Sequence, residues 1–68
     1  MITIGVDLGG TKTLVAAFGA DGELLGQERH ATEPERGSAA VLDAIAAAVR
    51  RLDAAHGAAT AIGVGFAG

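Results

Sequence analysis

The chain has 68 residues and a net charge of −3 at pH 7. It contains no cysteine, which excludes disulfides and thiolate zinc sites. It has no basic run and only two aromatic residues, and no apolar stretch reaches the ~18–20 residues of a membrane span, so neither nucleic acid nor a membrane is an expected partner. Half of the residues are hydrophobic, but 16 of these are alanine, so the chain is expected to share its core with further structure.

The first expected element is a buried strand over residues 2–7, because this segment is rich in β-branched and apolar side chains. Asp7 interrupts the apolar run and no basic segment precedes it, so a secretory signal is not expected and a cytoplasmic location is predicted. A turn with the adjacent Gly9 and Gly10 follows, and residues 13–18 are expected to form a second strand.

A hairpin connection leads to a third, more polar strand expected over residues 23–30. A helix is predicted over residues 38–56, with Ser38 as its N-cap and Gly57 after its end. Residues 60–64 are expected to form a fourth strand. The large apolar residues predicted to share the buried face of the helix are Val41, Leu42, Ile45, Val49 and Leu52.

These elements predict an α/β fold with the order β-β-β-α-β. Hairpin links make the first three strands antiparallel, and a right-handed crossover through the helix allows the fourth strand to lie parallel to the first. The helix covers one face of such a sheet. Apolar residues of the first, second and fourth strands are expected on the other face, where this chain has nothing to cover them.

The turn after the first strand carries the most specific chemistry. Gly9 and Gly10 permit backbone N–H groups to approach an anion, while Thr11 and Lys12 supply a hydroxyl and an ammonium group. Because a carboxylate repels phosphate, Asp7 is expected to hold Mg²⁺ or its water shell instead. The alternative interpretation is an ordinary β-turn with a solvated lysine.

Two glycine patterns are similar to nucleotide-binding motifs. Gly5 and Gly10 have the spacing of a Walker A loop, but the lysine does not follow Gly10 directly and a strand is expected next, so a P-loop is rejected. Gly63, Gly65 and Gly68 match the GxGxxG pattern, which also needs a helix and a later acidic residue to bind a dinucleotide. A dinucleotide-binding βαβ module is therefore a weak alternative.

Residues 4–12 resemble the first phosphate motif of the ROK family (repressor, ORF, kinase), within the actin/hexokinase/Hsp70 ATPase superfamily. Residues 61–68 look like the segment before the sugar-proximal loop of that family, with alanine at position 67 where many members have proline. Lys12 and Thr13 also resemble BadF/BcrA-type ATPases and N-acetylglucosamine kinases, but Leu8 favours ROK. The resemblance implies the incomplete start of an actin-like (ribonuclease H-like) ATPase domain, which begins β-β-β-α-β.

The resemblance also implies ATP-dependent phosphorylation of a sugar hydroxyl, as in a glucokinase. Asp7 and residues 9–12 would then contact Mg–ATP, with Asp7 reaching the metal through water, and Gly65 and Gly68 would belong to the substrate loop. Members of this family have two domains. The general base, the remaining sugar-binding residues and any structural zinc motif would therefore lie outside these 68 residues.

The resemblance leaves a choice between a kinase and a regulator. Because Met1 stands directly before the first strand, no N-terminal DNA-binding domain is expected, which favours the kinase. The parent protein is expected to be a homo-oligomer, and residues 1–68 alone are predicted to be inactive. A non-catalytic, sugar-responsive ROK regulator or an inactive actin-like fragment is the alternative.

Overall fold

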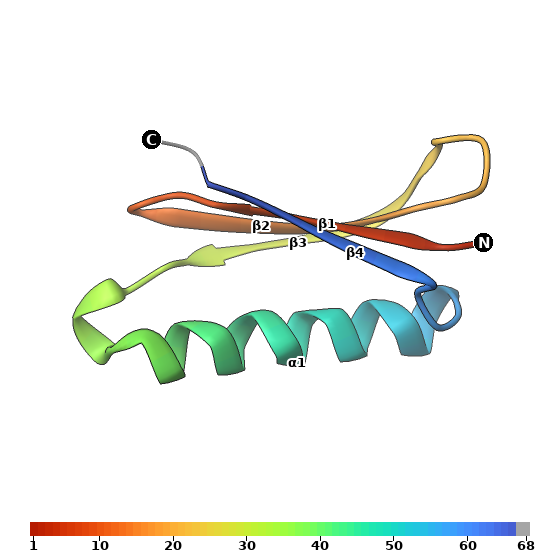
Figure 1. Cartoon of the computed structure of the whole chain (residues 1–68). Helices are drawn as coiled ribbons and strands as arrows, with labels where there is room; N and C mark the ends of the chain where they lie inside the picture. The colour runs from red at the N-terminus through yellow and green to blue at the C-terminus, as the bar shows by residue number, and fades with distance from the viewer. Residues whose placement is uncertain (67–68) are drawn as a thin grey trace.

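A computed structural model describes residues 1–66 of the chain. Its elements follow the expected order, and Figure 1 shows one sheet lying across one long helix. The strand boundaries differ from the predicted ones by at most two residues, and the helix boundaries coincide with them. In chain order the elements are β1 (Thr3–Leu8), β2 (Lys12–Phe18), β3 (Leu24–Ala31), the 3-10 helix η1 (Pro34–Arg36), α1 (Ser38–His56) and β4 (Ala61–Phe66).

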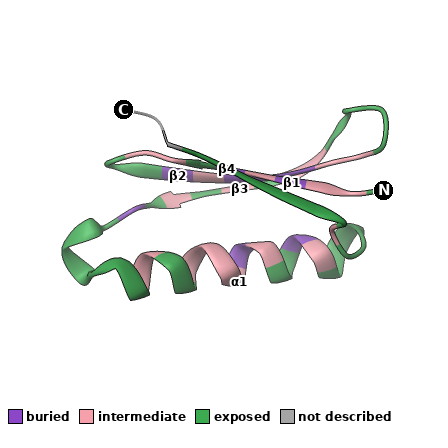
Figure 2. Cartoon of the chain, in the orientation of Figure 1, coloured by how far each residue is buried: buried purple, intermediate pink, exposed green. Residues whose placement is uncertain are grey.

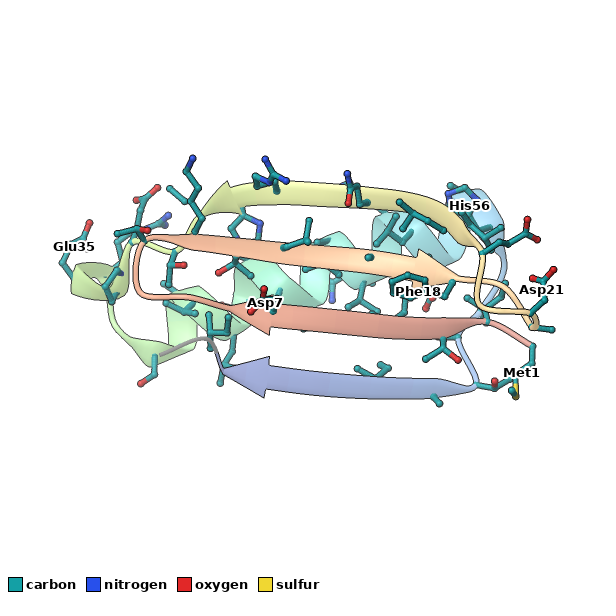
Figure 3. The ribbon with its side chains drawn as sticks, turned by 90° about the horizontal axis from the view of Figure 1, so that it is seen from above. Met1, Asp7, Phe18, Asp21, Glu35 and His56 are labelled. Atoms are coloured by element: carbon teal, nitrogen blue, oxygen red, sulfur yellow. The ribbon has the colours of Figure 1, made fainter. Side chains whose placement is uncertain are left out.

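The four strands form one sheet in the order β3-β2-β1-β4. The pairs β1–β2 and β2–β3 are antiparallel, whereas β4 pairs in parallel with β1, with Ile62 opposite Ile4. Since parallel strands run in the same direction, the carboxyl ends of β1 and β4 meet at one edge of the sheet. The turn between β1 and β2 lies at this same end (Figures 1 and 3).

The core lies between the sheet and α1. Side chains alternate between the two faces of a strand, so every second residue of β1 and β2 points toward the helix. Opposite pairs such as Val6 and Val15 therefore share the buried face. The buried apolar residues of this core are Ile4, Val6, Val15, Ala17, Ala48 and Leu52.

The ends of α1 are determined by glycines. The prediction of Ser38 as the N-cap is wrong, because Gly37 occupies that position with a φ of 96° and its carbonyl accepts the Val41 N–H at 3.2 Å. A positive φ is strained for residues with a Cβ, which explains glycine there. Gly57 ends the helix as predicted, with a φ of 106° and its N–H donated to the Asp53 carbonyl at 2.8 Å.

The prediction of apolar residues on the uncovered face of the sheet holds for Leu14 and Phe18 of β2 and is wrong for β4. The helix packs against β2 and β3, so the part of the sheet formed by β4 is exposed (Figure 2). By their register with Ile4 and Val6, the exposed Ile62 and Val64 are on the same side of the sheet as α1, rather than on the opposite face. Leu42 of α1 is also exposed, so its predicted burial is wrong.

An ion pair joins α1 to β3. The Arg51 guanidinium donates hydrogen bonds of 2.6, 2.8 and 3.0 Å to the two carboxylate oxygens of Glu28. These hydrogen bonds hold the pKa of Glu28 below its usual value. Exposed pairs of this kind contribute little to stability, but a bidentate geometry orients the helix on the sheet. Among residues 1–66, no helix combines the length and hydropathy that a membrane span requires.

The Glu28–Arg51 pair predicts a pH-dependent stability. Because the folded-state pKa of Glu28 is lowered, the contribution of Glu28 to stability is complete above about pH 4.5. It is lost as the pH falls through the folded-state pKa. Replacing Glu28 with Gln is expected to lower the thermal midpoint slightly at pH 7, and this difference should shrink below about pH 4.5. Thermal unfolding of the unsubstituted protein and of Glu28→Gln from pH 3 to 7 measures the difference in midpoint and its change with pH.

The control is Glu35→Gln, because the structure shows no ion pair for the exposed Glu35 within residues 1–66. This variant should have the same thermal midpoint as the unsubstituted protein at every pH. A Glu28→Gln deficit of the same size at pH 3 and pH 7 would contradict the assigned role of the charge pair.

Candidate functional site

The β1–β2 turn is tight, and its two glycines have different surroundings. The Gly9 N–H donates to the Lys12 carbonyl at 3.0 Å. A Cβ on Gly9 would lie 2.8 Å from that same carbonyl oxygen, so the turn requires glycine there. A Cβ on Gly10 would meet nothing within 4 Å. Packing within the chain therefore does not explain glycine at position 10, whose backbone is open to a ligand.

Charged side chains gather on the sheet face away from α1. Figure 3 looks onto this face and shows Asp7 at the end of β1. Register places Asp7 opposite Leu14, and alternation places Lys12 on the face of Leu14. Among residues 1–66, neither Asp7 nor Lys12 forms an ion pair, and both are exposed. Their charges are therefore available to a ligand.

Arg29 of β3 adds a second cation to this face. It lies opposite Leu14 in the β2–β3 pairing and is thus a diagonal neighbour of Lys12. A hollow of about 310 Å³ next to the turn is lined by Thr11, Lys12, Arg29, His30 and Ala31. Two cations beside a glycine turn favour binding of an anion.

The second glycine motif lies beside the first. Parallel pairing places Gly65 of β4 next to Asp7, and Gly63 next to Gly5. A shallow hollow of about 330 Å³ on this face includes Asp7, Phe18 and Gly65 in its lining. Because these glycines have no side chains, the surface around Asp7 is open. Gly68 lies outside the described residues.

The position of Gly63 and Gly65 also bears on the dinucleotide alternative. Both residues lie inside β4, which continues to Phe66. A dinucleotide fingerprint places its first glycines in the turn between a strand and a helix. The geometry of residues 63–66 is therefore not typical of that fingerprint.

Three residues near the turn were not predicted from the sequence: Arg29, Thr13 as a buried side chain, and Thr32. Alternation along residues 23–30 could have placed Arg29 on the face of Lys12 once the register was known. Thr32 follows β3 in a connection without regular pattern, and nothing local in the sequence indicates its burial. Its contacts appear only because β3 ends beside the turn.

A larger hollow of about 610 Å³ lies beneath the turn, between β1 and the start of α1. Its lining is mainly apolar and includes Leu8, Val41 and Leu42. Among the described residues, no group of three or more histidine, cysteine or acidic side chains is placed to hold a metal ion. A cation at Asp7 would therefore need most of its ligands from a bound molecule or from water.

Comparison with known proteins gives the family of the chain. The model of the ROK family matches residues 3–68. The chain belongs to the ROK family. No curated protein matches the sequence.

A solved structure resembles this ROK chain along its whole length. It is the crystal structure of a ROK family glucokinase from Streptomyces griseus in complex with glucose and AMPPNP, with 38% sequence identity and a TM-score of 0.83. The match covers 100% of this chain and 21% of the glucokinase chain. The β-β-β-α-β order is thus the beginning of the actin-like fold that was expected, and the chain spans about a fifth of the glucokinase.

Proposed function

We propose that this ROK chain is part of an ATP-dependent kinase that phosphorylates a hydroxyl group of a sugar. The proposal is supported by its similarity, over the whole chain, to a glucokinase crystallised with glucose and AMPPNP. In this proposal, residues 1–68 supply the first phosphate-binding motif of a longer protein. That complete protein is called the full-length protein below.

The observation that carries the proposal is the open turn between Asp7 and Lys12. Phosphate oxygens accept hydrogen bonds from backbone N–H groups, and the backbone at Gly10 has nothing within 4 Å of a would-be Cβ to block their approach. Thr11 can donate its hydroxyl proton, and Lys12 supplies a point charge. These residues stand at the carboxyl edge of the sheet, where open α/β sheets bind ligands.

Asp7 suits magnesium better than it suits phosphate. Mg²⁺ is commonly bound through one or two carboxylates, with phosphate oxygens and water completing its octahedral shell. A single exposed carboxylate with no ion-pair partner in residues 1–66 fits that requirement. Bound Mg²⁺ would neutralise phosphate charge, and Asp7 would hold it or its water shell beside the turn.

The proposed division of labour leaves the general base outside this chain. Phosphoryl transfer depends mainly on positioning and on charge neutralisation, to which Asp7, Lys12 and the turn would contribute. Gly65 lies in β4 next to Asp7, so it is proposed to border the substrate loop rather than belong to it, and Gly68 is proposed to belong to that loop. A cytoplasmic location and a homo-oligomeric assembly of the full-length protein remain predictions.

The proposal predicts ATP-dependent phosphorylation of a sugar by the full-length protein. A coupled assay of ADP release with glucose and other hexoses measures it, and residues 1–68 alone should show no turnover. Sugar binding without phosphoryl transfer would contradict the kinase assignment and favour a ROK regulator. Turnover by residues 1–68 alone would contradict the placement of the base outside the chain.

A further inference from the structure

Two buried threonines lie beneath the β1–β2 turn. Thr13 of β2 is fully buried, at 0% exposure, and Thr32, which follows β3, is 8% exposed. A buried hydroxyl is costly unless it forms a hydrogen bond. The partners of these two side chains therefore show what their burial achieves.

The donors and acceptors in the hydrogen bonds of this pair can be assigned. The Thr32 hydroxyl donates to the Gly9 carbonyl at 2.8 Å, and a carbonyl oxygen can only accept. The Thr13 and Thr32 hydroxyl oxygens are 2.8 Å apart. Since a hydroxyl has one proton and that of Thr32 is used on Gly9, Thr13 must be the donor to Thr32. The series thus runs from Thr13 through Thr32 to the turn.

Thr32 holds the turn at a second point as well. Its backbone N–H donates to the Thr11 carbonyl at 2.9 Å. The carbonyls of Gly9 and Thr11, on either side of Gly10, therefore both accept a hydrogen bond from the same residue. This residue belongs to a different part of the chain from the turn that it restrains.

The first of these hydrogen bonds determines where the Gly10 N–H points. A peptide unit is planar and trans, so the Gly10 N–H points opposite to the Gly9 carbonyl. Because that carbonyl points to Thr32, the Gly10 N–H points away from the buried threonine pair. Gly10 itself is exposed. The donor is therefore directed toward the side from which an anion can approach.

We propose that Thr32, oriented by Thr13, is a positioning residue that holds the Gly10 N–H ready for a nucleotide phosphate. Neither threonine needs to touch the nucleotide. This inference rests on the proposed function, because it assigns the ligand of the turn. It adds that preorganisation of the turn depends on a side chain outside the phosphate motif.

The test removes the hydroxyl and retains the shape. In the full-length protein, Thr32→Val should weaken binding of Mg–AMPPNP about tenfold, because the Gly9 carbonyl and the Thr13 hydroxyl both lose their partner. Titration calorimetry measures this without turnover. Glucose affinity should be unchanged, and amide exchange in residues 9–12 should be faster without nucleotide. Thr32→Ser should restore the Mg–AMPPNP affinity and the slower amide exchange, and Thr13→Val should weaken Mg–AMPPNP binding about threefold.

The matched control is Thr60→Val. The exposed Thr60 hydroxyl donates to the Ile2 carbonyl at 3.2 Å, so this variant also loses a hydrogen bond from a threonine hydroxyl to a backbone carbonyl, at the opposite end of β1. It should bind Mg–AMPPNP as the parent does. An equal loss in Thr60→Val and Thr32→Val would reflect general destabilisation and would overturn the positioning role.

Lys12→Ala separates failure of this inference from failure of the proposed function. If Lys12→Ala weakens nucleotide binding and Thr32→Val does not, the positioning role is wrong and the phosphate site stands. If neither variant changes nucleotide binding, the proposed function of the turn is wrong. Should Thr32→Val fail to fold, Thr13→Val decides, and parental binding and exchange in that variant would overturn the inference.

Discussion

Alanine at Gly9 is expected to open the β1–β2 turn, whereas alanine at Gly10 is expected to leave the fold intact. A Cβ at Gly9 would lie 2.8 Å from the Lys12 carbonyl oxygen, which belongs to the backbone and cannot rotate away. The turn must then shift, and its 3.0 Å hydrogen bond from the Gly9 N–H must lengthen. The strain should destabilise the protein by about 1–3 kcal/mol.

Gly10→Ala is the matching substitution at the neighbouring glycine. Nothing lies within 4 Å of its would-be Cβ, and its φ is outside the left-handed region, so Gly10→Ala should leave the thermal midpoint unchanged or slightly raised. Nucleotide binding should nevertheless fall by about tenfold, since the methyl group obstructs the approach of a phosphate to the backbone.

Thermal unfolding and Mg–AMPPNP titration of both variants, in the full-length protein, measure these effects. Gly26→Ala serves as a steric control, because its Cβ would meet the end of the movable His56 side chain rather than backbone. Its effect on stability should be small. Parental nucleotide affinity in Gly10→Ala would show that no ligand approaches the turn closely.

Removing the charges of Asp7 and Lys12 should have the largest effect on catalysis. In the full-length protein, Asp7→Asn and Lys12→Ala are each expected to lower kcat/KM for Mg–ATP by about 10- to 100-fold, as expected for a lost charge-assisted interaction. The Asp7→Asn variant should also need more free Mg²⁺. Glucose affinity should change little, because neither side chain is proposed to bind the sugar.

Steady-state kinetics at varied ATP and free Mg²⁺ tests both substitutions. The controls are Asp21→Asn, in the exposed β2–β3 connection, and Arg50→Ala, an exposed cation of α1. Both remove a charge from the same chain, away from the turn, and should leave the kinetics unchanged. Parental ATP kinetics in both Asp7→Asn and Lys12→Ala would remove these residues from the site.

The local sequence pattern was sufficient to predict the strands, the helix and the glycine turn between β1 and β2. β-branched and apolar runs predict strands, alanine-rich periodicity predicts α1, and glycine marks the ends that need unusual backbone angles. Ser38 was predicted as the N-cap because serine is favoured there, but glycine is also accepted at that position. Only the observed φ of 96° at Gly37 distinguishes them.

The sidedness of the apolar surface could not be predicted in the same way. Whether Ile62 and Val64 are covered depends on where α1 crosses the sheet, and α1 packs over β2 and β3. Periodicity predicts that a face of a helix is apolar but not which strands it contacts. Leu42 belongs to the predicted apolar face and is nevertheless exposed for the same reason.

The sequence by itself determined the α/β order of the elements, the resemblance to the ROK family and the glycine turn after β1, because those features depend on neighbouring residues. Only the tertiary structure placed Gly65 beside Asp7, Arg29 near Lys12, and Thr32 beneath Gly9. These neighbours are far apart in the chain, and the register that brings them together follows from strand pairing and core packing. The extent of the core was likewise decided by the tertiary structure. One helix covers only part of this sheet, and the exposed apolar side chains of β4 lie where it does not reach.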